Sequence, residues 1–357
     1  MFRDVYRSRR VLLTGHTGFK GSWLALWLHV LGAEVTGVAL APDSTPSHWG
    51  LLGLGIRSHE ADIRDHVALR QIVLETQPEF VFHLAAQALV RSSYQDPLRT
   101  WSTNVMGTAN LLDACREVPG LGGIVVVTTD KCYENQEWPW GYREIDRLGG
   151  HDPYSASKAG TELVAASYRS SYFQVPGAPL LATARAGNVI GGGDWAPDRL
   201  IPDLVRAIAA GQPLRIRSPK ATRPWQHVLD ALSGYLTLGQ KMMEGEKKMA
   251  DAWNFGPGPE ANQTVAAVLA QMASTWPALA WEQATAQQPH EAKLLYLDSS
   301  KARAQLRWQP VWTLEDALAA TTEWYRAAET RAMQKSRAQL DRYVDAARVA
   351  GLEWAGS

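Results

Sequence analysis

The sequence of 357 residues has few cysteines, no excess of charge of either sign and no long apolar run. Its two cysteines, Cys115 and Cys132, lack the spacing of a metal-binding motif, which predicts free thiols in a reducing compartment. The net charge of zero argues against nucleic acid or an anionic membrane surface as the main partner. No apolar run approaches the roughly 20 residues of a membrane helix, and the charged N-terminal stretch differs from a signal peptide. We therefore expect a cytoplasmic protein that binds neither membranes nor nucleic acid.

What the first half does contain is a regular alternation of β-type and helical patterns. It predicts strands at 11–14, 34–40, 80–84, 123–129 and 180–185, and helices at 19–31, 65–76, 100–117 and 153–172. Such alternation is typical of an α/β fold with a Rossmann-type, doubly wound parallel sheet. The strands are apolar throughout, as a sheet covered on both faces requires.

Beyond residue 187 the elements become shorter and glycine and proline more frequent. Helices are predicted at 200–210, 228–243, 265–276 and 314–349, the last with a possible interruption, and strands at 214–216 and 253–255. The sequence thus predicts a Rossmann domain over 1–187, to which parts of 226–256 return. A smaller, mainly substrate-binding lobe follows over 188–325, and then a C-terminal helical tail over 326–357. The 15 tryptophans are expected mainly in the core.

A glycine-rich turn joins the first predicted strand to the first helix. Glycines there allow a tight turn, and backbone N–H groups at the helix N-terminus bind a pyrophosphate. The candidate dinucleotide-binding residues of this turn are Gly15, Thr17, Gly18, Phe19, Lys20 and Gly21. The alternative is a purely structural turn.

The acidic residue expected about 20 positions further on, which binds the ribose of NAD, is absent. Asp43 comes too late after the second strand. Asp62 and Ile63 are candidate contacts to the adenine edge. A helix cap that Asp62 forms with Asp65 is the alternative.

Tyr154 and Lys158 lie four residues apart, on one face of a predicted helix. A neighbouring ammonium and the positive charge of a bound nicotinamide favour phenolate, so the pKa of Tyr154 is expected to fall and the residue can act as a base. A surface helix pair is the alternative. After four β-α units, this pair resembles the short-chain dehydrogenase/reductase superfamily. The resemblance implies NAD as cofactor and places Leu84, Ala85, Ala86 and Thr128 beside it, together with Tyr154 and Lys158.

Thr129, Asp130 and Lys131, the Thr-Asp-Lys loop, follow the fourth long strand. They stand where the nucleotide-sugar 4,6-dehydratases of the extended superfamily carry Thr-Asp-Glu. The resemblance implies that Tyr154 is the base for C4 oxidation, that Thr129 bonds the reacting hydroxyl and that Asp130 protonates the departing C6 hydroxyl. Lys131 replaces the commoner glutamate, so its role as the C5 base stays open. A solvated loop pair is the alternative for Asp130 and Lys131.

Six segments resemble CDP-glucose 4,6-dehydratases within a similarity that spans about 9–326. They are 14–26 (TGHTGFKGSWLAL), 83–91 (HLAAQALVR), 128–133 (TTDKCY), 185–199 (RAGNVIGGGDWAPDR), 223–228 (RPWQHV) and 290–298 (HEAKLLYLD). Arg307 departs from the family pattern, in which a glycine is expected. The resemblance implies a lyase that turns CDP-D-glucose into CDP-4-dehydro-6-deoxy-D-glucose and water, for deoxysugar and O-antigen synthesis. The alternatives are another nucleotide-sugar 4,6-dehydratase, a 4-epimerase or ketoreductase, and a non-catalytic dinucleotide-sensing module.

Several polar and aromatic residues are candidates for binding a nucleotide sugar, because arginine pairs with diphosphate and amides suit phosphate or ribose. The candidates are Gln87, Arg91, Asn188, Trp195, Arg199, Leu200, Arg217, Arg223 and Asn254, with Trp225 as a second possible cover for the base or sugar. Any one of them has a surface or core role as its alternative. The histidines lack metal spacing, so no metal is expected. The resemblance implies a homodimer, or a tetramer, assembled through the helices at 100–117 and 153–172.

Overall fold

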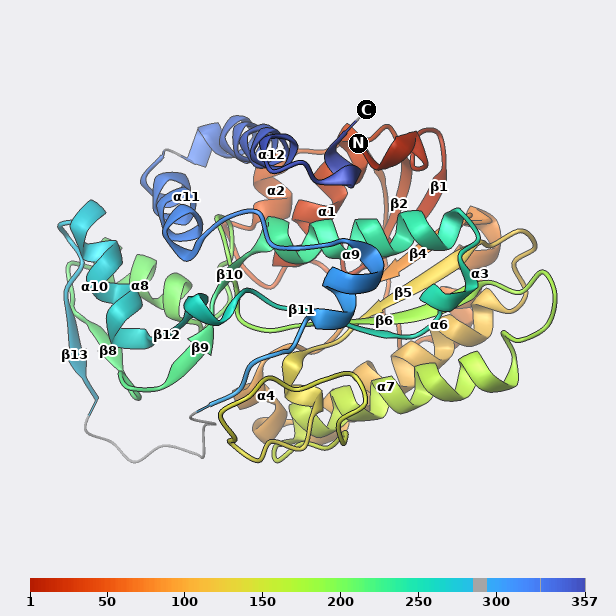
Figure 1. Ribbon diagram of the computed structural model, residues 1–357, viewed down its shortest axis with the longest axis horizontal. Helices are drawn as coiled ribbons and strands as arrows, with labels where there is room; N and C mark the ends of the chain where they lie inside the picture. The colour runs from red at the N-terminus through yellow and green to blue at the C-terminus, as the bar shows by residue number, and fades with distance from the viewer. Residues whose placement is uncertain (285–293, 328, 357) are drawn as a thin grey trace.

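The protein is described here by a computed structural model that covers residues 1–284, 294–327 and 329–356. Its centre is a seven-stranded sheet in the order β11-β6-β5-β4-β1-β2-β3, parallel throughout (Figure 1). The strands are β1 (Arg10–Thr14), β2 (Glu34–Ala39), β3 (Arg57–Glu60), β4 (Phe80–His83), β5 (Gly123–Val127), β6 (Leu180–Ala186) and β11 (Ala252–Phe255). The predicted Rossmann-type fold class is confirmed.

Helices cover both faces of this sheet. One face carries α3 (His66–Thr76), α6 (Gly107–Cys115) and α7 (Pro153–Ser171), and the other carries α1 (Phe19–Val30) and α9 (Val228–Met243), with α12 (Ala332–Val349) packed outside them. Along β5, Ile124 and Val126 join the core on the first of these faces, while Val125 and Val127 join the core on the second. Both sets are buried, which is why the strand is apolar throughout.

The smaller lobe lies beyond the sheet, on the left of Figure 1. It contains the helices α8 (Leu200–Ala209), α10 (Val265–Thr275) and α11 (Leu314–Arg326). It also contains three two-stranded sheets. They pair β7 (Val189–Ile190) with β10 (Gln226–His227), β8 (Leu214–Ile216) with β13 (Trp281–Gln283), and β9 (Thr222–Pro224) with β12 (Asn262–Thr264). Ile201, Trp225, Leu269 and Leu318 belong to its core. β11 returns to the large sheet beside β6.

The helix predicted at 100–117 is broken in the structure. It consists of α5 (Pro97–Trp101), a π-helical turn (Ser102–Met106) and α6. The Asn104 side chain turns inward and bonds the backbone N–H and C=O of Gln87 at 2.8 and 3.0 Å, and also the Ser157 hydroxyl at 2.8 Å. A π turn of this kind re-aims a side chain and is frequent at functional sites. The helical periodicity of the sequence carried no sign of it.

Short elements also escaped prediction, among them β3, α2 (His48–Leu52) and α4 (Val90–Gln95). The helix predicted at 314–349 is two helices, α11 and α12, as the expected interruption allows. Arg307, where a glycine was expected, adopts a left-handed backbone with φ 52°. That conformation costs a non-glycine residue about 1–2 kcal/mol. Of the segment 290–298, residues 290–293 lie outside the described residues.

The C-terminal residues pack against the Rossmann core. Trp354 stacks on Phe2 with ring centroids 5.1 Å apart, and Tyr343 of α12 meets Trp27 of α1 edge-on at 5.8 Å. Tyr343 also donates a hydrogen bond to Asp230 of α9 at 2.8 Å. The N-terminus, α9 and α12 therefore share one buried face. Within the described ranges, no helix has both the length and the apolar character to cross a membrane.

Replacing Trp308 by alanine should destabilise the fold by about 3–5 kcal/mol. Trp308 is fully buried, donates its indole N–H to Ser233 at 2.9 Å and packs edge-on against Phe255 at 5.0 Å. The matched control is Trp140→Ala, since that ring is 57 % exposed and its loss should stay within about 0.5 kcal/mol. Urea unfolding followed by circular dichroism measures both, and equal midpoints for the two variants would contradict the packing described.

Candidate active site

A cavity of about 970 Å³ opens between the Rossmann domain and the smaller lobe. Its wall on the Rossmann side includes Thr128 and the Thr-Asp-Lys loop, which follow the carboxyl end of β5, and Tyr154, which lies in the first turn of α7. The opposite wall includes residues of α8, β8 and β9. The carboxyl edge is where parallel α/β sheets bind their ligands. The structure therefore brings the predicted catalytic loop and most predicted substrate residues to one cavity.

The Thr-Asp-Lys loop is held by its own hydroxyl group. Thr129 donates to Asp130 Oδ1 at 3.0 Å and accepts from the Lys131 N–H at 3.3 Å. Asp130 is 3 % exposed, and its Oδ2 has no hydrogen-bond partner among the described residues. Burial raises the pKa of this carboxyl group, although the positive charges of Lys131, Lys20 and Arg223 oppose the rise. The loop thus presents a carboxyl group that is biased toward its protonated form.

Helix α7 carries the Tyr154/Lys158 pair and starts at a well-formed cap. Asp152 accepts hydrogen bonds from the Ser155 N–H at 2.9 Å and the Ser155 hydroxyl at 2.6 Å. Tyr154 lines the cavity, whereas Lys158 is buried behind it and donates to the Val127 carbonyl at 3.2 Å. The first turn of α7 therefore fixes the direction of the phenol.

Burial controls the protonation of both groups. It raises the pKa of Tyr154 to about 12 and lowers that of Lys158 to about 8. The fall predicted for the Tyr154 pKa included the charge of a bound nicotinamide. In the chain alone the pKa rises instead, because desolvation outweighs the favourable contacts. The Thr129 hydroxyl group and Arg199 only reduce the rise. A positively charged cofactor beside the phenol would supply the missing stabilisation of phenolate.

The glycine turn fits a pyrophosphate. Gly15 has φ 76°, and a Cβ there would lie 2.6 Å from the backbone nitrogen of Ala85. A Cβ on Gly21 would lie 2.0 Å from the Gly15 carbonyl oxygen. Gly18 caps the 12-residue helix α1 and offers no side chain to its first N–H groups. A close backbone turn and a helix N-terminus without a side-chain cap are the features that bind a dinucleotide phosphate.

The remaining predicted cofactor residues surround this turn. Thr17 donates to the Leu40 carbonyl at 2.9 Å, beyond the end of β2. Leu84, Ala85 and Ala86 follow the carboxyl end of β4, where Ala85 donates its N–H to Thr14 at 3.2 Å. Lys20 lines the cavity, as Thr128 does, and burial lowers its pKa to about 7. Phe19 is the first residue of α1.

Asp62 and Ile63 lie in different environments. Asp62 is paired with Arg64, with nitrogen to oxygen distances from 2.6 to 3.1 Å, while Asp65 caps α3 by accepting from Ala68 at 3.0 Å. The predicted cap therefore forms, but through Asp65. Ile63 is buried, and a Cβ on Gly107 would come within 2.5 Å of it.

Sequence reasoning overlooked His16 inside the glycine turn. Its ring lies over Gly37 in β2, where a Cβ would come within 2.5 Å of it, and its Nε2 lies 2.8 Å from the Ser58 hydroxyl. The signal in the sequence was a histidine between the glycines of the motif. Only the register of β2 against β1 and β3 shows what it contacts.

Six of the nine predicted substrate residues line the cavity: Arg91, Asn188, Arg199, Leu200, Arg217 and Arg223. Three are not among its lining residues. Gln87 hydrogen-bonds Thr100 at 2.9 Å and the Leu89 backbone at 2.5 and 3.0 Å. Trp195 packs edge-on against Tyr325 at 5.4 Å, and Trp225 lines the cavity instead.

Asn254 is the third of these residues and is fully buried. Its amide group donates to the Tyr142 and Asp298 carbonyls at 2.8 and 3.1 Å and accepts from the Tyr133 hydroxyl at 2.8 Å. All three bonds join segments that are distant in the sequence. Its place at the end of β11 indicated the correct edge of the sheet but not the direction of the side chain.

Two aspartates hold the cavity arginines in place, and sequence reasoning missed both. Asp198 lies 2.9 Å from Arg91 and 4.0 Å from Arg217, so it joins α4 to the segment after β8. Asp194 pairs with Arg199 at 3.0 Å. Both aspartates occur in the segment 185–199, whose glycines and tryptophan drew attention first. Arg91, Arg199 and Arg217 are thereby held at the cavity wall.

Comparison with known proteins decides the family. The model of the family described as GDP-mannose 4,6 dehydratase matches residues 12–321 of this chain. The chain belongs to that family. The sequence-based assignment to the nucleotide-sugar 4,6-dehydratases of the extended short-chain dehydrogenase/reductases is thus confirmed.

Relatives of this dehydratase chain cover nearly its whole length. A CDP-glucose 4,6-dehydratase of Salmonella typhimurium strain LT2 is 47 % identical over 332 residues, which cover 91 % of this chain and 92 % of the relative. A dTDP-glucose 4,6-dehydratase of Xanthomonas campestris pv. campestris is 27 % identical, over 89 % of this chain and 93 % of its own. Among solved structures, the dTDP-glucose 4,6-dehydratase DesIV of Streptomyces venezuelae, solved with NAD bound, has a TM-score of 0.75 at 25 % identity, over 90 % of this chain and 97 % of its own.

Replacing Asp130 by asparagine should stabilise this dehydratase at neutral pH. Burial raises the folded-state pKa of Asp130 above its unfolded value, so the ionised carboxylate lowers stability above that folded pKa, and the penalty disappears below the unfolded pKa of about 3.9. The urea midpoint of Asp130→Asn should exceed that of the wild type at pH 7 and converge with it toward about pH 4. The exposed Asp43→Asn is the control and should change neither value. A lower midpoint for Asp130→Asn at pH 7 would contradict this account.

Proposed function

We propose that this chain is an NAD-dependent hydro-lyase that converts CDP-D-glucose into CDP-4-dehydro-6-deoxy-D-glucose and water. The observation that carries the proposal is the buried Asp130 carboxyl group, which lines the same cavity as Tyr154 and whose Oδ2 has no hydrogen-bond partner among the described residues. An epimerase or ketoreductase needs no such acid, and a dinucleotide sensor needs no base. The choice of cytidine rests on the 47 % identity to the Salmonella enzyme.

Two sets of residues carry out the two halves of the reaction, oxidation at C4 and elimination of water. Tyr154 removes the proton of the sugar C4 hydroxyl group, and Thr129, which lines the same cavity, orients that hydroxyl. NAD, when bound at the glycine turn, would supply the hydride acceptor for the oxidation at C4 and the hydride donor for C6, which no side chain can provide. Lys158, four residues further along α7, supplies a positive charge that favours the phenolate. The glycine turn holds the cofactor phosphates.

Elimination of water belongs to the Thr-Asp-Lys loop. Oxidation of C4 acidifies the proton on C5, and Asp130 gives its proton to the C6 hydroxyl group as that group leaves. The raised pKa of Asp130 suits this role, because a general acid must be protonated near the working pH. Lys131 lines the same wall and is the candidate to remove the C5 proton. The residues that bind the sugar nucleotide are Arg91, Arg199, Arg217 and Arg223 at the diphosphate, with Asn188 and Leu200 beside them.

The setting of the enzyme follows from the product. A 4-keto-6-deoxy sugar nucleotide is a precursor for deoxysugars, so we place the enzyme in the cytoplasm, in the synthesis of surface polysaccharide such as O-antigen. The scheme needs no metal, because its acid, its base and its charge stabilisation all come from side chains.

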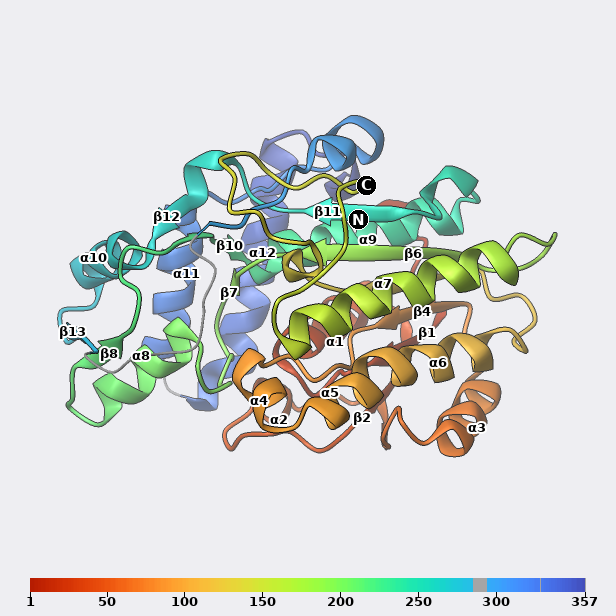
Figure 2. The same cartoon turned by 90° about the horizontal axis from the view of Figure 1, so that it is seen from below.

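A homodimer is part of the same proposal. Leu98, Trp101, Met106 and Leu163, the helical patch, are large apolar side chains that are 41–80 % exposed on α5, the π turn and α7. These helices lie side by side on one face, as Figure 2 shows. An exposed apolar surface of this kind marks an interface. Two copies related by a two-fold axis would form a four-helix contact there, and a tetramer would need a second surface.

Two variants should separate oxidation from elimination. Tyr154→Phe removes the C4 base, so neither NADH fluorescence nor product should appear. Asp130→Asn keeps the base but loses the acid, so NADH should accumulate while product formation falls about 10²–10⁴-fold. Single-turnover mixing of CDP-glucose with NAD-loaded enzyme measures both signals, and Asp43→Asn serves as the exposed control. Wild-type product formation by Asp130→Asn would show that the acid is another group.

The double variant Leu98→Glu/Leu163→Glu should convert the dimer into a monomer. Two carboxylates in a packed interface remain without partners and oppose association. Val349→Glu is the matched control, since that α12 side chain is 90 % exposed and lies outside the helical patch. Sedimentation velocity gives the mass of each, and an unchanged dimer for the double variant would place the interface elsewhere.

A further inference from the structure

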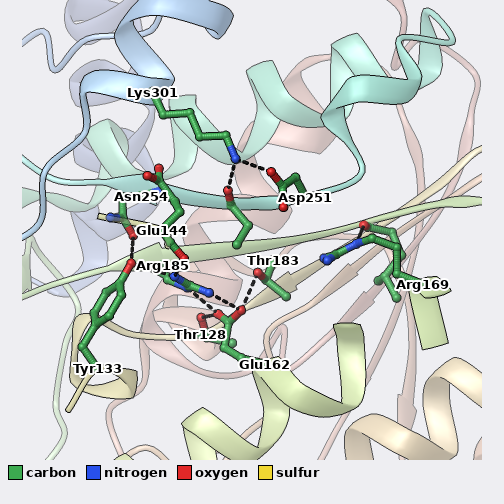
Figure 3. A network of polar contacts seen from close by, with 12 residues as sticks. Thr128, Tyr133, Glu144, Glu162, Arg169, Thr183, Arg185, Asp251, Asn254 and Lys301 are labelled. Carbon is green, nitrogen blue, oxygen red and sulfur yellow. Dashed lines mark hydrogen bonds and ion pairs between the residues drawn. The ribbon is translucent and has the colours of Figure 1, made fainter. Parts of the chain in front are cut away.

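A buried polar network includes Thr128 and Tyr133, which lie on either side of the Thr-Asp-Lys loop in the sequence (Figure 3). At its centre the Glu162 carboxylate of α7, 3 % exposed, accepts from the Thr128 and Thr183 hydroxyl groups at 2.5 and 2.7 Å. The Arg185 guanidinium of β6 donates to the same carboxylate at 2.9 and 2.8 Å. Burial opposes ionisation, yet Arg185 and the two hydroxyl groups lower the pKa of Glu162 below its usual value. The carboxylate is therefore ionised and fully bonded.

The network holds the loop at both of its ends. Thr128 immediately precedes the Thr-Asp-Lys loop, and Tyr133 follows it after one further residue. Arg185 donates to the Tyr133 hydroxyl at 2.7 Å, and its guanidinium carbon lies 5.0 Å from the centre of that ring. Glu162 thus contacts one end directly and reaches the other through Arg185. In Figure 3 these side chains converge from α7, β5, β6 and the segment after the loop.

Glu162 also shares a helix face with the catalytic pair. Tyr154, Lys158 and Glu162 succeed one another at four-residue intervals along α7, so their side chains form one row. Of the other groups that influence or face Lys158, the thiol of Cys132 is neutral because burial raises its pKa, and the ring of His83 is neutral because burial lowers its pKa to about 3.

Lys20 adds positive charge toward Lys158 from α1. The carboxylate of Glu162 is the negative charge that favours the ammonium form of Lys158 against its burial. Without that charge, deprotonation of Lys158 would begin at a lower pH.

We propose that Glu162 is a positioning residue for the dehydration: it ties both ends of the Thr-Asp-Lys loop to the helix that carries Tyr154 and Lys158. This inference rests on the proposed function. The loop carries the acid, Asp130, and α7 carries the base, Tyr154. No covalent bond between these side chains fixes their relative position. One carboxylate bonded to both sets the distance between them.

The alternative is that the Glu162–Arg185 pair serves stability alone. A buried ion pair adds little net stability, because desolvation of both charges offsets their attraction, whereas breaking one side of it is strongly destabilising. Removing both charges therefore separates the two roles. If Glu162 positions the loop, a variant that lacks both charges should still fold but should lose the alignment of the acid with the base.

The test compares Glu162→Gln, the double variant Glu162→Gln/Arg185→Met and, as a buried control on α9, Asp230→Asn. Asp230 accepts a hydrogen bond from the Tyr343 hydroxyl of α12 at 2.8 Å and is not among the residues that line the cavity. Each protein is measured for thermal unfolding, for single-turnover NADH and product formation from CDP-glucose, and for the pH dependence of the oxidation rate.

The single variant should lose stability, because Arg185 is left unpaired. The double variant should unfold near the wild-type temperature, yet form product about tenfold more slowly or worse, because the acid is no longer held in line with the base. The alkaline limb of its pH profile should also move to lower pH by roughly one unit, since the ammonium form of Lys158 has lost its neighbouring carboxylate. Asp230→Asn should retain the wild-type profile.

A double variant that folds and keeps the wild-type rate and pH profile would overturn the proposal, as would a double variant that cannot fold. Failure of the proposed function is a separate outcome. In that case the wild type itself forms no 4-keto-6-deoxy product, whatever the behaviour of the variants.

Discussion

In a parallel sheet with helices on both faces, the loops that follow the strands gather at the carboxyl edge and lead into helix N-termini that favour anionic ligands, and this constraint organises the whole chain. The glycine turn follows β1, the segment 84–86 follows β4, the Thr-Asp-Lys loop follows β5 and the smaller lobe begins after β6. Strands that are neighbours in the sheet place these segments side by side, although they are far apart in the sequence. The proposed active site is the meeting point of these loops.

Burial then sets the chemistry at this edge. The same desolvation raises the pKa of Asp130 and lowers those of Lys20 and Lys158 to about 7 and 8. Burial thus moves the pKa of each of these three groups toward neutral pH, where a general acid or base transfers a proton most efficiently. Two groups are exceptions, because burial raises the pKa of Tyr154 to about 12 and Arg185 keeps Glu162 ionised. The site therefore combines groups that can titrate with a fixed charge beneath them.

The long elements could be predicted well from the sequence, and the side-chain directions poorly. Glycine spacing, apolar strands and the Tyr154/Lys158 interval are local patterns, and each indicated the correct element and edge of the sheet. Asn254 turned inward because distant segments supply its hydrogen-bond partners, and no local pattern encodes that. Gln87 is held instead by the backbone of Leu89 and by the Thr100 hydroxyl. Likewise, Asp198 meets Arg91 across the two lobes. The fall predicted for the Tyr154 pKa ignored burial, which only the packed structure reveals.

The central claim is a dehydratase with a preference for the cytidine nucleotide, and a substrate panel tests it most directly. Purified wild-type protein would be given CDP-, dTDP-, UDP- and GDP-glucose, each with added NAD or NADP, and the 4-keto-6-deoxy product would be quantified by mass spectrometry. The account predicts that CDP-glucose with NAD has the highest kcat/KM and that water is lost from the sugar. Absence of this product with all four substrates, or epimerisation without loss of water, would contradict it.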